Sequence, residues 1–205
     1  MMKFEEVVHI LMSEQRQAMK KWHPIEEANN LLFDSSVPVD INSKLGQARL
    51  KDLAWRCIEE LAEAMDENPG SKPMGVELID CLHFIVEFCI SSLGLEFKDD
   101  MIKVLNDRFA HPTKSMSDSV IKFVHMMGRA CNHLKNRAWK PERPEVDLES
   151  FKLQVLEAWL NFWHIIYHSD CFKNCDEVIE VFRDKAKINE QRIKDMEGEN
   201  GNSRI

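Results

Sequence analysis

The sequence has few of the residues that make turns. Glycine and proline occur only seven times each among 205 residues. Folds built from many short strands need frequent turns, so this composition disfavours an all-β protein. No stretch of useful length alternates apolar and polar side chains, whereas apolar residues recur at the three- to four-residue spacing of amphipathic helices. The sequence therefore predicts an all-α fold, a helical bundle of about six to seven helices.

The chain also lacks any C-x-x-C pair and any pattern of a cleaved signal peptide. Most of its six cysteines lie in apolar helical stretches, which indicates reduced thiols. The first residues, MMKFEEVVHILM, place two glutamates ahead of the apolar run and show no cleavage-site pattern. We therefore expect a cytoplasmic protein.

No long hydrophobic run is free of charged residues, and the overall charge is negative. The most apolar segment, residues 76–95, is interrupted by Glu77, Asp80, His83 and Glu87, so we expect it not to span a membrane. The formal net charge is −8, which disfavours holding a polyanion by a general positive field. These features predict that neither a membrane nor a nucleic acid is a partner.

The positions of breakers divide the chain into one helical domain over residues 1–196 and a disordered tail over residues 197–205. His23-Pro24 and Val37-Pro38 indicate a long connection over residues 23–45. The predicted helices cover about residues 2–22, 46–66, 74–93, 97–109, 118–137, 148–168 and 175–195. The stretch ENPGSKPMG between the second and third helices is a turn, so these two helices should be antiparallel neighbours.

Two acidic pairs stand on either side of this turn. Glu60 and Glu63 are three residues apart, and so are Glu77 and Asp80. Residues three apart on a helix share a side, so antiparallel packing can bring the four carboxylates together. Four negative charges within a few ångströms repel strongly, and oxygen ligands at this density suit Mg²⁺ or Mn²⁺. The pattern predicts a metal site.

The alternative is that both pairs lie on solvated helix surfaces. This alternative fits Glu60 and Glu63, because the helix predicted over residues 46–66 is amphipathic and has a solvent-facing polar side. It suits Glu77 and Asp80 less well, because apolar residues cover almost the whole circumference of residues 74–93, and that stretch holds no Lys or Arg to pair with a buried carboxylate.

The acidic pairs also carry a family resemblance. ELAE at residues 60–63 followed by ELID at residues 77–80 resembles the E-x-x-E and E-x-x-D signature of the all-α nucleoside triphosphate pyrophosphohydrolases, which include MazG-like enzymes and dimeric dUTPases. DCLHF at residues 80–84 is similar to the Asp-x-x-His-Phe of dimeric dUTPases. Phe182, Lys185, Asn189 and Arg192 resemble their C-terminal aromatic and K-x-x-x-N-x-x-R pattern. The resemblance covers about residues 46–196.

This resemblance implies a homodimeric, Mg²⁺-dependent enzyme that converts dUTP and water to dUMP and pyrophosphate. The metal ligands would be Glu60, Glu63, Glu77 and Asp80, and either Glu60 or Glu63 would be the catalytic base. Two departures from the family leave open a MazG-like enzyme that acts on another base. No aromatic residue occurs where many dimeric dUTPases have a tryptophan-rich run, residues 66–75, and the glycine-aromatic ending is missing.

Candidates for binding the substrate lie on two other stretches. Lys185, Asn189 and Arg192 are spaced i, i+4 and i+7, so they form one stripe that can bind a triphosphate or can simply end a solvated helix. Lys140, in the stretch HLKNRAWK, either contacts a phosphate or the base of the substrate, or it is simply a basic residue at the end of a helix.

Two inward polar residues are further candidates. Gln15 carries both a donor and an acceptor for a pyrimidine edge, or it satisfies neighbouring polar groups. His83 flanks the nucleotide or is a core histidine.

Other functions and sites also compete. Asp80-x-x-His83 and Glu6-x-x-His9 faintly suggest a ferritin-like di-iron protein, although their order along the chain does not fit. A helical interaction module without catalysis is a further alternative. His164 and His168 with two nearby cysteines have a spacing that zinc can use, but the surrounding aromatics favour core. Those aromatics, Trp159, Phe162 and Trp163, fit either a core or a dimer contact.

Overall fold

The computed structural model describes residues 2–29, 34–108, 115–135 and 145–202, and over these ranges it holds seven α-helices and no strand. This confirms the predicted all-α fold of six to seven helices. A short 3-10 helix, Leu95–Phe97, lies between the third and fourth α-helices. The α-helices are α1 (Phe4–Ala28), α2 (Lys44–Asp66), α3 (Lys72–Leu93), α4 (Lys98–Arg108), α5 (Met116–His133), α6 (Leu148–His168) and α7 (Cys175–Asn202).

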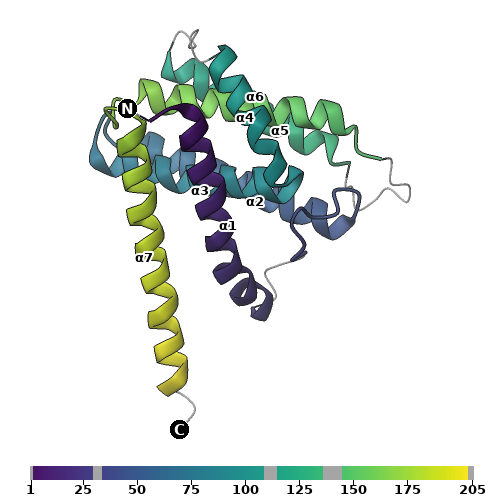
Figure 1. Ribbon diagram of the computed structural model, residues 1–205, viewed down its shortest axis with the longest axis vertical. Helices are drawn as coiled ribbons and strands as arrows, with labels where there is room; N and C mark the ends of the chain where they lie inside the picture. The colour runs from purple at the N-terminus through teal and green to yellow at the C-terminus, as the bar shows by residue number, and fades with distance from the viewer. Residues whose placement is uncertain (1, 30–33, 109–114, 136–144, 203–205) are drawn as a thin grey trace.

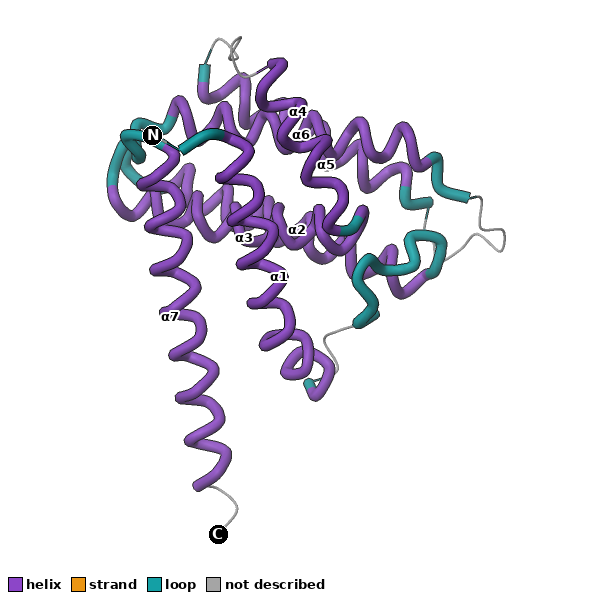
Figure 2. The backbone as a smooth tube through the Cα atoms, viewed as in Figure 1, coloured by secondary structure: helices purple, strands orange, loops and turns teal. Residues whose placement is uncertain are grey.

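Two helix pairs form the body of the molecule. The most extensive contacts join α2 with α3 and α5 with α6. The helices α1 and α7 both pack against α3 and against each other, and the C-terminal part of α7 extends away from the body (Figure 1). In the described part of the chain, loops lie at the N-terminal end and between helices (Figure 2). The backbone N–H of Met2 donates to Asp176 Oδ1 at 3.0 Å, which ties the N-terminal end to the start of α7.

The central helix is α3, which contacts α1, α2, α6 and α7. Most of its apolar side chains are buried, as the sequence predicts, so polar groups on this helix are carried into the interior. The aromatic cluster of α6 is buried within the single chain as well. Trp159 and Phe162 are 0% exposed, which assigns these residues to the core and not to an exposed contact surface.

The turn between α2 and α3 has local causes. Ser71 accepts a hydrogen bond from the Met74 N–H at 3.2 Å and caps the start of α3. Gly70 has a φ of 70°, a left-handed conformation that favours glycine. Because only residues 67–71 separate the two helices, the end of α2 and the start of α3 lie close together. The two acidic pairs are on these segments.

Two predicted boundaries are wrong. The first helix does not end near residue 22 but continues through Pro24 to Ala28, so the connection begins later than expected. Tertiary contacts explain this, because His23 and Glu26 in the last turns of α1 bind residues of α2 and α3. The last helix runs to Asn202, so residues 197–202 of the expected disordered tail are helical. Residues 203–205 lie outside the described residues.

In the described part of the chain, no single helix is long and apolar enough to cross a membrane. Only α3 taken together with Leu95–Asp107 meets that test, and the two are bent by 114°.

Candidate functional site

One pocket gathers most of the predicted site residues. It is a cavity of about 280 Å³ between α1, α2, α3 and α7. Binding pockets for small molecules usually measure about 300–1,000 Å³, so this volume suits a small ligand or part of a larger one. The predicted residues that line it are Gln15, Glu60, Asp80, His83, Lys185, Asn189 and Arg192.

Three of the four predicted carboxylates converge beside this pocket. Glu60 comes from α2, and Glu77 and Asp80 come from the first turns of α3. One oxygen of each lies within 4.8 Å of the others. Glu63 belongs neither to this group nor to the pocket lining, and its side chain is exposed. We call Glu60, Glu77 and Asp80 the carboxylate cluster.

The carboxylate cluster is electrostatically costly. Burial, with the charges of Asp80, Glu63 and Glu77, raises the pKa of Glu60 from 4.5 to about 7. Burial and the Asp80 charge also raise the pKa of Glu77. The pKa of Asp80 is raised by burial too, although Lys185 opposes the rise. Because it is unfavourable to ionise these carboxylates together, a cation beside them stabilises their charged forms.

A cation from α7 already contacts this cluster. Lys185 Nζ lies 2.5 Å from Asp80 Oδ2, and both side chains are 14% exposed. The expectation that Glu77 and Asp80 have no cationic partner is therefore wrong for Asp80. The partner comes from a helix more than one hundred residues later in the chain, so the sequence of α3 alone gives no sign of it.

The rest of the predicted stripe faces the same pocket. Asn189 and Arg192 line it together with Lys185. Arg192 Nη1 lies 3.4 Å from Asn189 Oδ1, and the Arg192 side chain is exposed. Ion pairs with α1 hold this part of α7 in place, since Lys21 pairs with Glu190 and Arg183 pairs with Glu14. A pocket with carboxylates on one side and two cations on α7 can hold a metal-bound polyphosphate.

Gln15 and His83 belong to a hydrogen-bond network inside the pocket. Gln15 Nε2 donates to Glu87 Oε2 at 3.1 Å, and Gln15 Oε1 lies 2.8 Å from His83 Nδ1. The His83 ring stacks on Phe182 at a centroid distance of 3.8 Å. Burial lowers the pKa of His83 to about 4, so the ring is neutral at pH 7. Its other nitrogen, Nε2, lies 3.3 Å from the carbonyl oxygen of Phe182. Both ends of the Gln15 amide are engaged within the protein, and reading a base would require these bonds to be exchanged.

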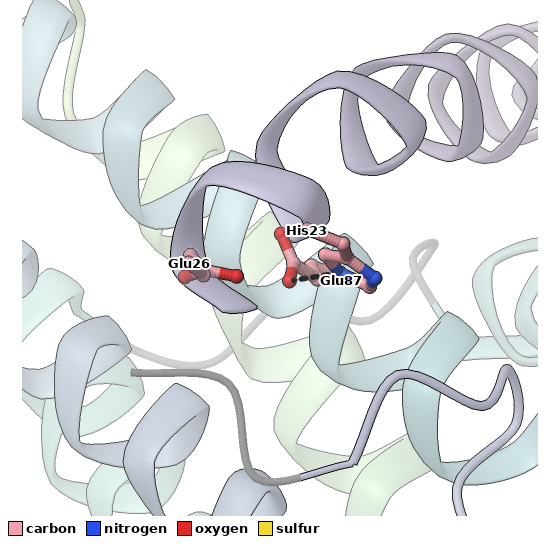
Figure 3. A group of neighbouring side chains, drawn as sticks. All are labelled: His23, Glu26 and Glu87. Carbon is pink, nitrogen blue, oxygen red and sulfur yellow. Dashed lines mark hydrogen bonds and ion pairs between the residues drawn. The ribbon is translucent and has the colours of Figure 1, made fainter. Parts of the chain in front are cut away.

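Sequence reasoning missed an ionic network next to Gln15. The guanidinium of Arg49, 2% exposed, contacts Glu26 and Glu87, with Nη2 at 2.8 Å from an oxygen of each. His23 Nε2 lies 3.4 Å from Glu87 Oε1. Figure 3 shows His23 and Glu26 from the last turns of α1 meeting Glu87 from α3. A signal in the sequence was Arg49 itself, placed between apolar residues of an amphipathic helix.

This second group also has the geometry of metal ligands. His23, Glu26 and Glu87 each offer an atom within 4.8 Å of the others. The Arg49 guanidinium already donates hydrogen bonds to the carboxylates of Glu26 and Glu87, and its positive charge balances their negative charges. Hydrogen bonds from His23 and Gln15 and the charge of Arg49 outweigh the effect of burial and lower the pKa of Glu87. Among the described residues only Arg49 Nε of this network is buried without a hydrogen-bond partner, so we interpret the network as a structural unit of the pocket wall.

Aromatic side chains supply an apolar part of the pocket. Trp22 from α1 and Phe84 from α3 line it, and the Arg56 guanidinium lies 5.6 Å from the centre of the Phe84 ring. The sequence has no aromatic residue at residues 66–75, where dimeric dUTPases often have several. Trp22 and Phe84 offer stacking surfaces from other elements.

The remaining candidates that the structure describes lie away from the pocket. Lys140 lies outside the described residues. Glu6 accepts a hydrogen bond from the Lys3 N–H at the start of α1, and His9 is exposed, so neither joins Asp80 and His83. His164 is buried in α6, and within the described ranges it forms no metal-ligand group with cysteines.

Comparisons of the chain with protein-family models, with curated proteins and with solved structures find no match. The motif resemblance and the geometry of the pocket are thus what support a function.

Proposed function

We propose that this protein is a Mg²⁺-dependent nucleoside triphosphate pyrophosphohydrolase, and that its substrate is dUTP. The observation that carries the proposal is the shared pocket. Glu60 and Asp80 line it next to Lys185, Asn189 and Arg192, although the two groups lie on helices far apart in the sequence. Carboxylates that bind a metal and cations that bind phosphates are the two parts that hydrolysis of a triphosphate needs.

The carboxylate cluster fits Mg²⁺ by its donor chemistry. Three carboxylate oxygens lie within 4.8 Å of one another, and hard oxygen donors are the ligands that Mg²⁺ and Mn²⁺ prefer. Glu60, Glu77 and Asp80 would hold the ion through their carboxylate oxygens. When bound, Mg²⁺ supplies neutralisation of phosphate charge and a lower pKa of the attacking water.

Residues of this chain then have distinct roles. Glu60 is better placed than Glu63 to take the proton from water, because Glu60 lines the pocket and Glu63 is exposed. The water oxygen bonds to the α-phosphorus, the bond to the α–β bridging oxygen breaks, and pyrophosphate leaves with that oxygen. Arg192 offers a two-pronged contact to phosphate and Lys185 offers a point charge.

The choice of base depends on the apolar part of the pocket. Trp22 and Phe84 give stacking surfaces, and the motif resemblance favours uracil. A MazG-like enzyme that acts on another base remains the second proposal, because the tryptophan-rich run of dimeric dUTPases is absent. The homodimer and the cytoplasmic location remain expectations from the sequence.

The experiment is a screen of all common dNTPs and NTPs with Mg²⁺, with pyrophosphate release as the readout. We expect turnover that requires the metal, is highest with dUTP and falls at least a hundredfold in Asp80→Asn. The matched control is Asp99→Asn, which changes an exposed aspartate of α4 outside the pocket. Absence of turnover with every triphosphate would favour the noncatalytic helical module.

A further inference from the structure

We propose that Lys185 is an internal cation that competes with the metal for the carboxylate cluster, and that a nucleoside triphosphate relieves this competition by giving Lys185 a new partner. This inference rests on the proposed function and deepens it. It makes metal binding and nucleotide binding mutually dependent.

The geometry places Lys185 at the cluster and not merely near it. Its ammonium contacts Asp80 at 2.5 Å, and Asp80 belongs to the group of three carboxylates within 4.8 Å of one another. The contact is shielded from water, since both side chains are 14% exposed. The packing of Phe182, one turn earlier in α7 and 0% exposed, fixes the backbone that carries Lys185.

A divalent ion at this cluster and the Lys185 ammonium cannot both be accommodated without cost. Two cations a few ångströms apart repel strongly in a partly buried site. If the ion uses the Asp80 oxygen that Lys185 contacts, the ammonium must leave. If the ion uses another oxygen, the repulsion remains. In either case the positive charge of Lys185 weakens the binding of a metal.

The Lys185 ammonium has an alternative partner once a triphosphate is bound. Lys185 lines the same pocket as Asn189 and Arg192, and its four-carbon stem is flexible. A phosphate oxygen in that pocket can replace the Asp80 carboxylate as its partner. The triphosphate therefore removes a competitor from the cluster and adds metal ligands of its own.

Linkage then gives a measurable consequence. If nucleotide raises the affinity for Mg²⁺ by some factor, Mg²⁺ raises the affinity for nucleotide by the same factor. The part of this coupling that comes from Lys185 should vanish when its charge is removed. Ordinary metal–phosphate coordination would leave a smaller remainder.

The experiment is calorimetric titration of Mg²⁺ into the full chain after treatment with EDTA and dialysis. Each titration is done without nucleotide and with saturating α,β-imido dUTP, whose α–β bridge resists cleavage. Lys185→Gln and Lys185→Met remove the charge, and Lys185→Arg retains it. Lys187→Gln is the matched control, because Lys187 lies on the same helix, is 75% exposed and pairs with Asp184 outside the pocket.

We expect both charge-removing variants to bind Mg²⁺ about tenfold more tightly than wild type without nucleotide, as loss of one charge-assisted contact implies. Their gain in Mg²⁺ affinity on adding nucleotide should shrink by a similar factor. Lys185→Arg and Lys187→Gln should behave as wild type. Circular dichroism melts identify a variant that fails to fold, and the other charge-removing variant then decides.

Unchanged or weaker Mg²⁺ binding in the folded charge-removing variants would overturn the competition. If the wild-type protein still hydrolysed dUTP in that case, the proposed function would stand, and only the competition between Lys185 and the metal would be rejected. Absence of Mg²⁺ binding in all variants, with and without nucleotide, would overturn both proposals.

Discussion

Replacing Glu60 by glutamine should stabilise the protein at alkaline pH while it destroys activity. Glu60 is forced to ionise beside Asp80 and Glu77, and its pKa is raised from 4.5 to about 7. Such a rise corresponds to roughly 3 kcal/mol for a fully buried carboxylate. Because Glu60 is partly exposed, solvent screening reduces the expected gain to about 1–2 kcal/mol.

The sign of the pH dependence follows from the direction of this shift. The folded pKa of Glu60 lies above the unfolded pKa, so the folded state bears no penalty below about pH 4.5. The penalty grows as the pH rises and is complete once the pH has passed about 7. Glutamine resembles the protonated acid and never pays this penalty. The variant should therefore gain stability over wild type between pH 4.5 and pH 8.

The assay is urea unfolding of wild type and Glu60→Gln at pH 4.5 and pH 8, in EDTA. We expect the free energy of unfolding to differ little at pH 4.5 and by about 1–2 kcal/mol at pH 8, or about 2–8 °C in Tm for a chain of this size. Glu59→Gln, an exposed neighbour on α2, is the control and should show no such pH-dependent gain. A variant that is less stable than wild type at pH 8, or equally stabilised at both pH values, would refute the cluster electrostatics.

Three further predictions concern the pocket. Arg192→Ala should lower kcat/KM about ten- to a hundredfold in steady-state kinetics, because a charge-assisted phosphate contact is lost. The Tm of this variant should hardly change, since the Arg192 side chain is exposed. An unchanged kcat/KM would mean that Arg192 is only part of a solvated helix end. Burial lowers the pKa of His83 to about 4, so wild type should lose stability as the pH falls from about 6.5 to about 4. Urea unfolding should show a smaller loss in His83→Gln, and an identical loss would exclude His83 as its source. In competition assays dUTP should be preferred over dCTP, dTTP and dATP, and preference for a purine would reject the dUTPase proposal while leaving the metal site intact.

The local features of the fold could be predicted from the sequence. The spacing of apolar residues predicted every α-helix of the described chain, and the turn expected in the stretch ENPGSKPMG predicted that α2 and α3 are neighbours. The end of α1 was not predicted, because proline was read as a stop. The contacts of His23 and Glu26 that extend the helix beyond Pro24 involve residues of α2 and α3, which local rules do not include.

The site was predictable only where its residues are close in sequence. Three carboxylates of two adjacent helices converge as their spacing implied. Glu63 does not join them, although Glu60 and Glu63 have the same spacing as Glu77 and Asp80, and the Glu63 side chain is exposed. The contact of Lys185 with Asp80 and the network around Arg49 join helices distant in sequence. Periodicity identifies which side of each helix faces inward, but it does not pair one helix with another.

The measurement that tests the proposed function most directly is hydrolysis of dUTP in water enriched in ¹⁸O, with mass spectrometry of both products. If water attacks the α-phosphorus in this pocket, one ¹⁸O appears in dUMP and none in pyrophosphate. The reaction should require Mg²⁺ and be lost in Asp80→Asn. Label in pyrophosphate or inorganic phosphate, or equal turnover by wild type and Asp80→Asn, would contradict it.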